Sequence, residues 1–211
     1  TIGEIAFSIG GVPYLAAEDG TWSIDEGIFA TLYVEGDDTL SDREELTVTW
    51  TPSDMDSNHT ETTFGPESSI EYAWDEPGIH MILAYVTDND GVASSTVQGF
   101  VRVNNIAPIM NGLPTQQALF EDEILILDAS AIDFADQDKL KFCWDLLSYV
   151  DSDEDGDMTN DCDVEDANLV MTWSTPGLRI ITANVWDDND AHDSKTVQVT
   201  IVNRPPIAKI S

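Results

Sequence analysis

The sequence predicts an all-β protein made of two consecutive antiparallel β-sandwiches. One passage occurs twice, because Trp74 and Trp173 lie 99 positions apart (173 − 74), as do Gly78 and Gly177. A repeat of this length sets the number of domains. After each glycine, every second residue belongs to one face, as a pleated strand requires. Turns rich in Asp, Asn and Gly separate the strands, and a proline that cannot continue a ladder follows each copy.

Composition limits the classes of partner. The 211 residues are enough for two cores of ordinary size. Acidic residues outnumber basic ones 41 to 8, which gives a net charge of −33 and disfavours nucleic acid and anionic membrane surfaces as partners. Such a charge suits a saline or divalent-rich medium. The alternative of a disordered chain is disfavoured by 42% hydrophobic residues and six Trp. No apolar run reaches membrane-spanning length, so we expect no membrane insertion.

The repeated passage carries a family resemblance. Each copy runs from Pro-Gly through an alternating strand into Val-x-Asp-x-x-Gly/Asp, and then into Val-x-Val/Ile-x-Asn-x-x-Pro. This pattern resembles the end of a PKD domain, and the resemblance covers nearly the whole chain twice. It implies tandem immunoglobulin-like β-sandwiches. Family members usually follow the mid-domain Trp with Asp-Phe-Gly-Asp-Gly, whereas Thr-Pro-Ser follows Trp50 and Asp-Leu-Leu follows Trp144. This departure leaves the subfamily open.

The repeat also predicts the domain boundaries. We expect residues 1–10 to be an N-terminal arm or the end of a preceding domain, and residues 205–211 to begin a further repeat or form a C-terminal arm. The first sandwich is expected over 11–104 and the second over 105–204. Within them we expect strands at 28–34, 46–50, 124–127 and 140–144. Trp50 and Trp144 are each expected between the two sheets of their sandwich. Asn58 begins a candidate N-glycosylation sequon.

An Asp-rich loop is predicted at 151–163 in the second domain. The separation between the two tryptophans of a domain is 24 in the first (Trp50 to Trp74) and 29 in the second (Trp144 to Trp173), and the extra positions fall here. Asp at alternate positions followed by Gly156 places carboxylate oxygens for calcium, as in the loops of EF-hands and thrombospondin type 3 repeats, which this stretch resembles. An EF-hand has a bidentate Glu where Cys162 stands, so we expect Asp161 or Asp163 to complete the shell. The alternative is a solvated acidic turn. The predicted calcium ligands are Asp151, Asp153, Asp155, Asp157, Asp161 and Asp163.

The two cysteines, Cys143 and Cys162, are predicted to form a surface disulfide. Leu140, Phe142 and Trp144 share the core face, so Cys143 points the other way. A bridge would tie the loop to its own strand and would indicate an oxidising, extracellular setting. Two free thiols remain the alternative.

Other acidic groups carry a weaker signal. Asp133, Asp136 and Asp138 could meet Asp187 or Asp190 in a calcium site near one end of the domain. The rough counterparts in the first domain are Asp42, Glu44, Glu45, Asp88 and Asp90. The alternative is that these are solvated faces.

For an enzyme the sequence offers nothing recognisable. The three histidines are scattered, no Ser or Cys has an evident base, and a pair of carboxylates is expected by chance in so acidic a chain. We expect His80 to be a satisfied core histidine.

Strand alternation predicts an apolar outer face in the first domain. With His80, Ile82, Ala84 and Val86 inward, the outward residues are Ile79, Met81, Leu83 and Tyr85. An uncovered sandwich should have polar residues there, so we expect either residues 1–20 or a neighbouring copy to cover this face. In the second domain Leu178, Ile180 and Trp186 point outward, with Thr182 and Asn184 between them. The alternative is a shift of strand register by one residue.

These observations favour an extracellular structural or adhesive module of a cell-surface protein. It is expected to be stabilised by Ca²⁺ and to assemble into a surface array or filament with other copies of itself or with neighbouring domains. The alternative is a carbohydrate- or protein-binding accessory region of a secreted hydrolase, with surface glycans or proteins as partners. An enzyme is the third and least supported class.

Overall fold

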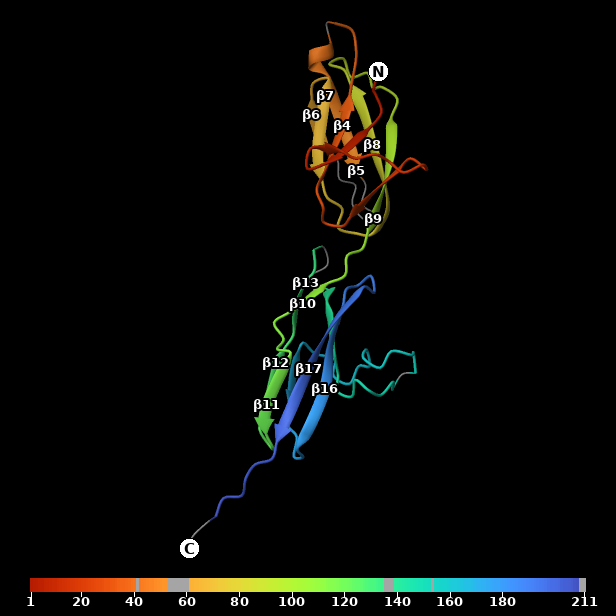
Figure 1. Cartoon of the computed structure of the whole chain (residues 1–211). Helices are drawn as coiled ribbons and strands as arrows, with labels where there is room; N and C mark the ends of the chain where they lie inside the picture. Colours follow the sequence, from red (N-terminus) through yellow and green to blue (C-terminus); the bar gives the residue numbers. More distant parts are fainter. Residues whose placement is uncertain (41, 53–60, 135–138, 153, 209–211) are drawn as a thin grey trace. The chain divides into compact units, whose positions relative to one another are not determined.

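The computed structural model describes the chain apart from residues 41, 53–60, 135–138, 153 and 209–211 (Figure 1). The chain forms two compact units, Thr1–Ile106 and Ala107–Ser211. The boundary between the units therefore lies two residues beyond the position expected from the repeat. Residues 205–208 are exposed and lie outside the strands. Within the described ranges, no helix is long and apolar enough to span a bilayer.

Two sheets form the first unit, with the strand orders β2-β1-β4-β7 and β3-β9-β8-β5-β6. The strands are β1 (Ala6–Ile9), β2 (Val12–Pro13), β3 (Thr21–Asp25), β4 (Ala30–Glu35), β5 (Thr47–Pro52), β6 (Glu61–Phe64), β7 (Glu67–Tyr72), β8 (Gly78–Thr87) and β9 (Val97–Asn104), with a 3₁₀ turn, η1 (Arg43–Glu45), before β5. The pairs are antiparallel except for β3 with β9, which is parallel.

Residues 1–10, expected to be an arm or part of a preceding domain, belong to the first sandwich. Strand β1 pairs with β4 along Phe7 and Leu32, and Ile5 and Phe7 are buried in the core. The ring of Phe7 stacks on that of Trp22, with 5.2 Å between the ring centroids. The expectation was wrong because the pairing of β1 with β4 joins segments more than twenty residues apart, which no local pattern records.

The second unit repeats the arrangement. Its strands are β10 (Ile109–Asn111), β11 (Gln116–Phe120), β12 (Leu125–Asp128), β13 (Ser130–Ile132), β14 (Lys141–Asp145), β15 (Asn168–Met171), β16 (Gly177–Trp186) and β17 (His192–Val202). One sheet has the order β11-β17-β16-β14, and β11 is parallel to β17 as β3 is to β9. On the other side β10 pairs with β13 and β12 with β15. Only Ala129 separates β12 from β13, so these two short strands together correspond to β4 of the first unit. Strand β10 then corresponds to β1, and β15 corresponds to β7.

The predicted fold class is therefore confirmed: the chain is all-β, with two tandem immunoglobulin-like sandwiches whose sheets are antiparallel apart from one parallel pair each. The four expected strands match β4, β5, β12 and β14 to within two residues. Trp50 and Trp144 are both fully buried, as predicted. The indole Nε1 of Trp50 donates a hydrogen bond to Ser68 Oγ at 2.9 Å. Truncating a core Trp of this kind to Ala typically costs about 3–5 kcal/mol.

Strand alternation also follows the prediction. In β8 the residues His80, Ile82, Ala84 and Val86 are buried. In β16 the residues Ile181, Ala183 and Val185 are buried in the core of the second sandwich. The alternative of a one-residue shift in register is thereby excluded for these strands, because it would have turned both sets outward.

Candidate metal centre

The Asp-rich loop lies between β14 and β15 and projects from the second unit beside β16 (Figure 1). The predicted disulfide between Cys143 and Cys162 is present, with 5.5 Å between the Cα atoms. Cys143 faces away from Trp144 and the core, as expected, yet it is 1% exposed because the loop covers it. The disulfide thus fixes the end of the loop to the middle of a strand.

Two hydrogen bonds hold the loop on the sheet. Ser148 Oγ lies 2.9 Å from Thr182 Oγ1, and Asn184 Nδ2 donates to the carbonyl oxygen of Thr159 at 2.9 Å. Thr182 and Asn184 point outward on β16, as predicted, but both are buried. Polar residues on this face are therefore explained by the loop that they bind rather than by solvent.

The alternating aspartates shape the loop. Asp151 Oδ2 accepts a hydrogen bond from Gly156 N at 3.0 Å, and Gly156 has a φ of 96°, which favours glycine. Asp155 accepts from Asp157 N at 2.7 Å and from Asn160 Nδ2 at 2.8 Å. The side chain and the backbone N–H of Thr159 both bind Asp157, and these bonds lower the pKa of the Asp157 carboxyl group. Each bond orders the turn around a carboxylate.

Two carboxylates close the loop. Asp161 is 4% exposed and its Oδ2 accepts from Ser152 N at 2.8 Å, which brings the end of the loop beside its beginning. Asp163 Oδ2 accepts from Leu146 N at 2.8 Å. Predicted ligand Asp153 lies outside the described residues. Among those described, no three His, Cys, Asp or Glu side chains are arranged to hold a metal ion.

Sequence reasoning missed Asp145, which is the last residue of β14. It is 0% exposed and pairs in register with Thr182 of β16. Burial raises the pKa of the Asp145 carboxyl group, and the charges of Asp163 and Asp161 raise it further, whereas hydrogen bonds from Leu147 and Ser148 lower it. Alternation from Cys143 would have placed Asp145 on the outer face, but it gave no sign that this face is covered.

The weaker acidic groups mainly hold turns. Asp187 is buried and its Oδ1 accepts from Asn189 N and Ala191 N, both at 2.9 Å. Asp88 accepts in the same way from the backbone two and four residues later, at 3.0 and 2.8 Å. Each carboxylate therefore closes the turn after the long strand of its sandwich.

Among the described members of these groups, no three side chains are gathered around one point. Asp133 is buried, Asp190 is exposed in its turn, and Asp136 and Asp138 lie outside the described residues. In the first unit Glu45 accepts from Asn89 Nδ2 at 2.6 Å, and Asp42 accepts from Thr39 Oγ1 at 2.7 Å.

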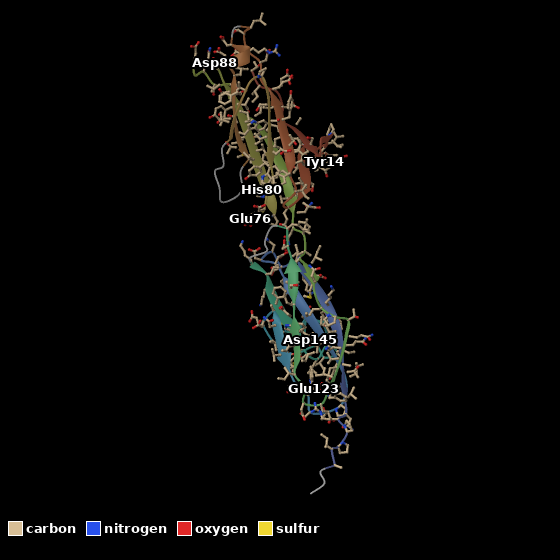
Figure 2. All side chains as sticks on the ribbon, turned by 90° about the vertical axis from the view of Figure 1, so that its left-hand side faces the viewer. Tyr14, Glu76, His80, Asp88, Glu123 and Asp145 are labelled. Carbon is tan, nitrogen blue, oxygen red and sulfur yellow. A yellow bond between two sulfur atoms is a disulfide. The ribbon has the colours of Figure 1, made fainter. Side chains whose placement is uncertain are left out.

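His80 is a satisfied core histidine, as expected. It is 2% exposed and its Nε2 lies 2.8 Å from the carbonyl oxygen of Glu76 (Figure 2). Asn58, the glycosylation candidate, lies outside the described residues.

The predicted apolar outer face of β8 is present in the first unit. Ile79 is 52% exposed and Met81 is 38% exposed, while Leu83 and Tyr85 are half-buried. Met81 is opposite Phe100 of β9, which is also exposed. Residues 1–20 contribute β1 and β2 to the other sheet, so β1 and β2 are not a cover for this face.

Neither a family model nor a curated protein matches the chain. Solved structures with a similar arrangement include fibronectin(III)-like modules of Clostridium thermocellum CbhA, at 15% identity and a TM-score of 0.34, over 93% of this chain and 94% of that one. Titin domains Z1Z2 in complex with telethonin are 11% identical, with a TM-score of 0.42, over 96% of this chain and 100% of that one.

A third similar structure contains three N-terminal domains of the bacteriophage RB49 outer capsid protein Hoc. It is 19% identical, with a TM-score of 0.41, and the match covers 85% of this chain but only 56% of that one. Because all three TM-scores lie below 0.5, the fold assignment rests on the strand order and the cores described above. The resemblance to PKD domains stays a prediction.

Proposed function

We propose that the chain is a calcium-stabilised structural or adhesive module of an extracellular or cell-surface protein, and that it is not an enzyme. The observation that carries the proposal is the Asp-rich loop, which is fixed by the Cys143–Cys162 disulfide to the strand that it covers. Disulfides persist in oxidising compartments, which supports the extracellular assignment. A net charge of −33 also favours a medium in which cations screen repulsion.

The residues of the loop fit a hard cation. Asp151 uses Oδ2 for Gly156 N, while its Oδ1 is shielded from solvent and has no hydrogen-bond partner among the described residues. Asn160 donates to Asp155 through Nδ2, and its Oδ1 is likewise shielded and unpartnered. Calcium takes six to eight oxygen ligands of these types. Asp151 and Asn160, with Asp161 at the closing end, are the described residues that would hold the ion.

Titration calorimetry with calcium tests this proposal. We expect one ion to bind per chain, and Asp151→Asn to weaken binding roughly tenfold or more because it removes a charged ligand. Asp166→Asn is the matched control, because it removes the same charge from an exposed residue outside the loop. The Asp166 carboxylate accepts a hydrogen bond from Asn168 N at 2.9 Å. Negligible heat from the unmodified protein, or equal affinity for the unmodified protein and Asp151→Asn, would refute calcium binding by the loop.

We also propose that the outer face of β8 is an assembly surface for a second copy. Ile79 and Met81 are exposed on this face, and Met81 lies opposite the exposed Phe100 of β9, which supports a need for cover. Calcium would offset the repulsion between copies that each carry −33.

Light scattering at high protein concentration with calcium tests the assembly. Met81→Asp should abolish self-association, because it places a charge in the apolar contact, and should leave the fold intact, because Met81 is outside the core. Ser69→Asp, an exposed position on the opposite sheet, adds the same charge and should have no effect. A protein that stays monomeric without any substitution would show that the assembly proposal is wrong.

A further inference from the structure

We propose that Asp145, a residue of the sheet rather than of the loop, is a ligand of the same cation. The ion would then join the loop to β14 from beneath. This inference rests on the proposed binding of calcium by the loop and names a residue that the Asp-x-Asp pattern does not include.

The Asp145 carboxylate is buried without a compensating charge. Its Oδ1 accepts from Leu147 N at 2.7 Å, whereas Oδ2 is inaccessible to solvent and has no hydrogen-bond partner among the described residues. The hydroxyl of Ser148 also hydrogen-bonds to the Asp145 carboxylate, and it lies 2.9 Å from Thr182 Oγ1. No Lys or Arg of the described chain forms an ion pair with Asp145, and the nearest lysine along the strand, Lys141, pairs with Glu165 at 3.4 Å. A buried charge in this condition is costly unless a cation reaches it.

Two more carboxylates lie close to Asp145. The negative charges of Asp163 and Asp161 act on Asp145 strongly enough to raise its pKa. Asp163 is placed there by its bond from Leu146 N, the residue after Asp145. Three carboxylates near one another beneath a loop repel each other, and a divalent cation would remove that repulsion.

Asp161 connects Asp145 to the loop site. Its Oδ2 accepts from Ser152 N, directly after Asp151, so Asp161 lies near both the sheet carboxylate and the start of the loop. The shielded, unpartnered oxygens of this region are Asp145 Oδ2, Asp151 Oδ1 and Asn160 Oδ1. These are all hard oxygen donors, as calcium requires. Among the described residues no three acidic side chains are already arranged around one point, so a bound cation would have to draw these oxygens together.

The proposal predicts opposite effects of Asp145→Asn with and without calcium. The amide keeps an acceptor for Leu147 N but removes the buried charge. In EDTA the melting temperature of the variant should equal or exceed that of the unmodified protein, since a repulsion is lost. With saturating calcium the variant should melt at a lower temperature than the unmodified protein, since binding to the native state stabilises it by an amount that grows with the logarithm of the affinity. A merely structural role would lower the melting temperature under both conditions.

The experiment compares the whole chain with Asp145→Asn, Asp151→Asn and Asp166→Asn, by calcium titration calorimetry and by thermal unfolding in EDTA and in calcium. We expect Asp145→Asn and Asp151→Asn each to weaken calcium binding roughly tenfold or more, with Asp166→Asn unchanged. If Asp151→Asn weakens binding and Asp145→Asn does not, Asp145 holds only a water or its hydrogen bond, and this inference fails while the loop site stands. If the unmodified chain binds no calcium, both proposals fail. If Asp145→Asn melts at a lower temperature in EDTA, the carboxylate is structural and the inference is overturned.

Discussion

At the scale of single residues, the structure shows which side chains act through contacts distant in sequence. Trp22 packs directly over Gly99, where a Cβ atom would lie 2.6 Å from its ring. The indole cannot easily retreat, because its Nε1 donates to Tyr14 O at 3.1 Å and its ring stacks on Phe7. Nothing in the sequence near Gly99 indicates this contact, because it depends on the parallel pairing of β3 with β9.

Gly99→Ala should therefore destabilise the first sandwich. Forcing a methyl group against a fixed indole typically costs about 1–3 kcal/mol. Urea unfolding followed by Trp fluorescence measures the change. Gln98→Ala, at the exposed neighbouring position, is the control and should stay within about 0.5 kcal/mol of the unmodified protein. An unchanged midpoint for Gly99→Ala would contradict the packing of Trp22.

At the scale of elements, the alternation of apolar residues along a strand predicted which side chains face the core. Alternation gave the inward and outward faces of β8 and β16, and it gave the outward direction of Cys143 from the inward direction of Trp144. It could not place β1, whose partner β4 lies elsewhere in the chain. It also could not show that Thr182 and Asp145 are buried, because their burial depends on contacts with the segment that follows β14 and not on the sequence of either strand.

The disulfide should hold this loop in place. We expect Cys143→Ser/Cys162→Ser to destabilise the second sandwich by roughly 3 kcal/mol, the chain-entropy value for a loop of this size. The sequence separation of the two cysteines is 19. Hydrogen exchange should increase at Asn184 and Thr159, because the hydrogen bond between the Asn184 side chain and the Thr159 carbonyl oxygen links the loop to β16. Unchanged protection at these residues in the serine variant would mean that hydrogen bonds alone hold the loop.

At the scale of the whole chain, the two sandwiches share the order of four strands in one sheet, β3-β9-β8-β5 and β11-β17-β16-β14, but differ in the outer face of the long central strand. The second sandwich covers that face at Thr182 and Asn184 with a disulfide-bonded acidic loop and leaves Leu178 exposed, while the first exposes Ile79 and Met81. Shared topology fixes the fold, and the function follows from these differences. We therefore propose cation binding at the loop beside β14 and β16, and assembly at the outer face of β8.

The most direct test of the cation site is a crystal structure of the intact chain grown with calcium. We expect one ion bound by oxygens of Asp151, Asp161 and Asp145, with metal–oxygen distances of about 2.3–2.6 Å. An ordered loop at saturating calcium with only water beside these three carboxylates would contradict it.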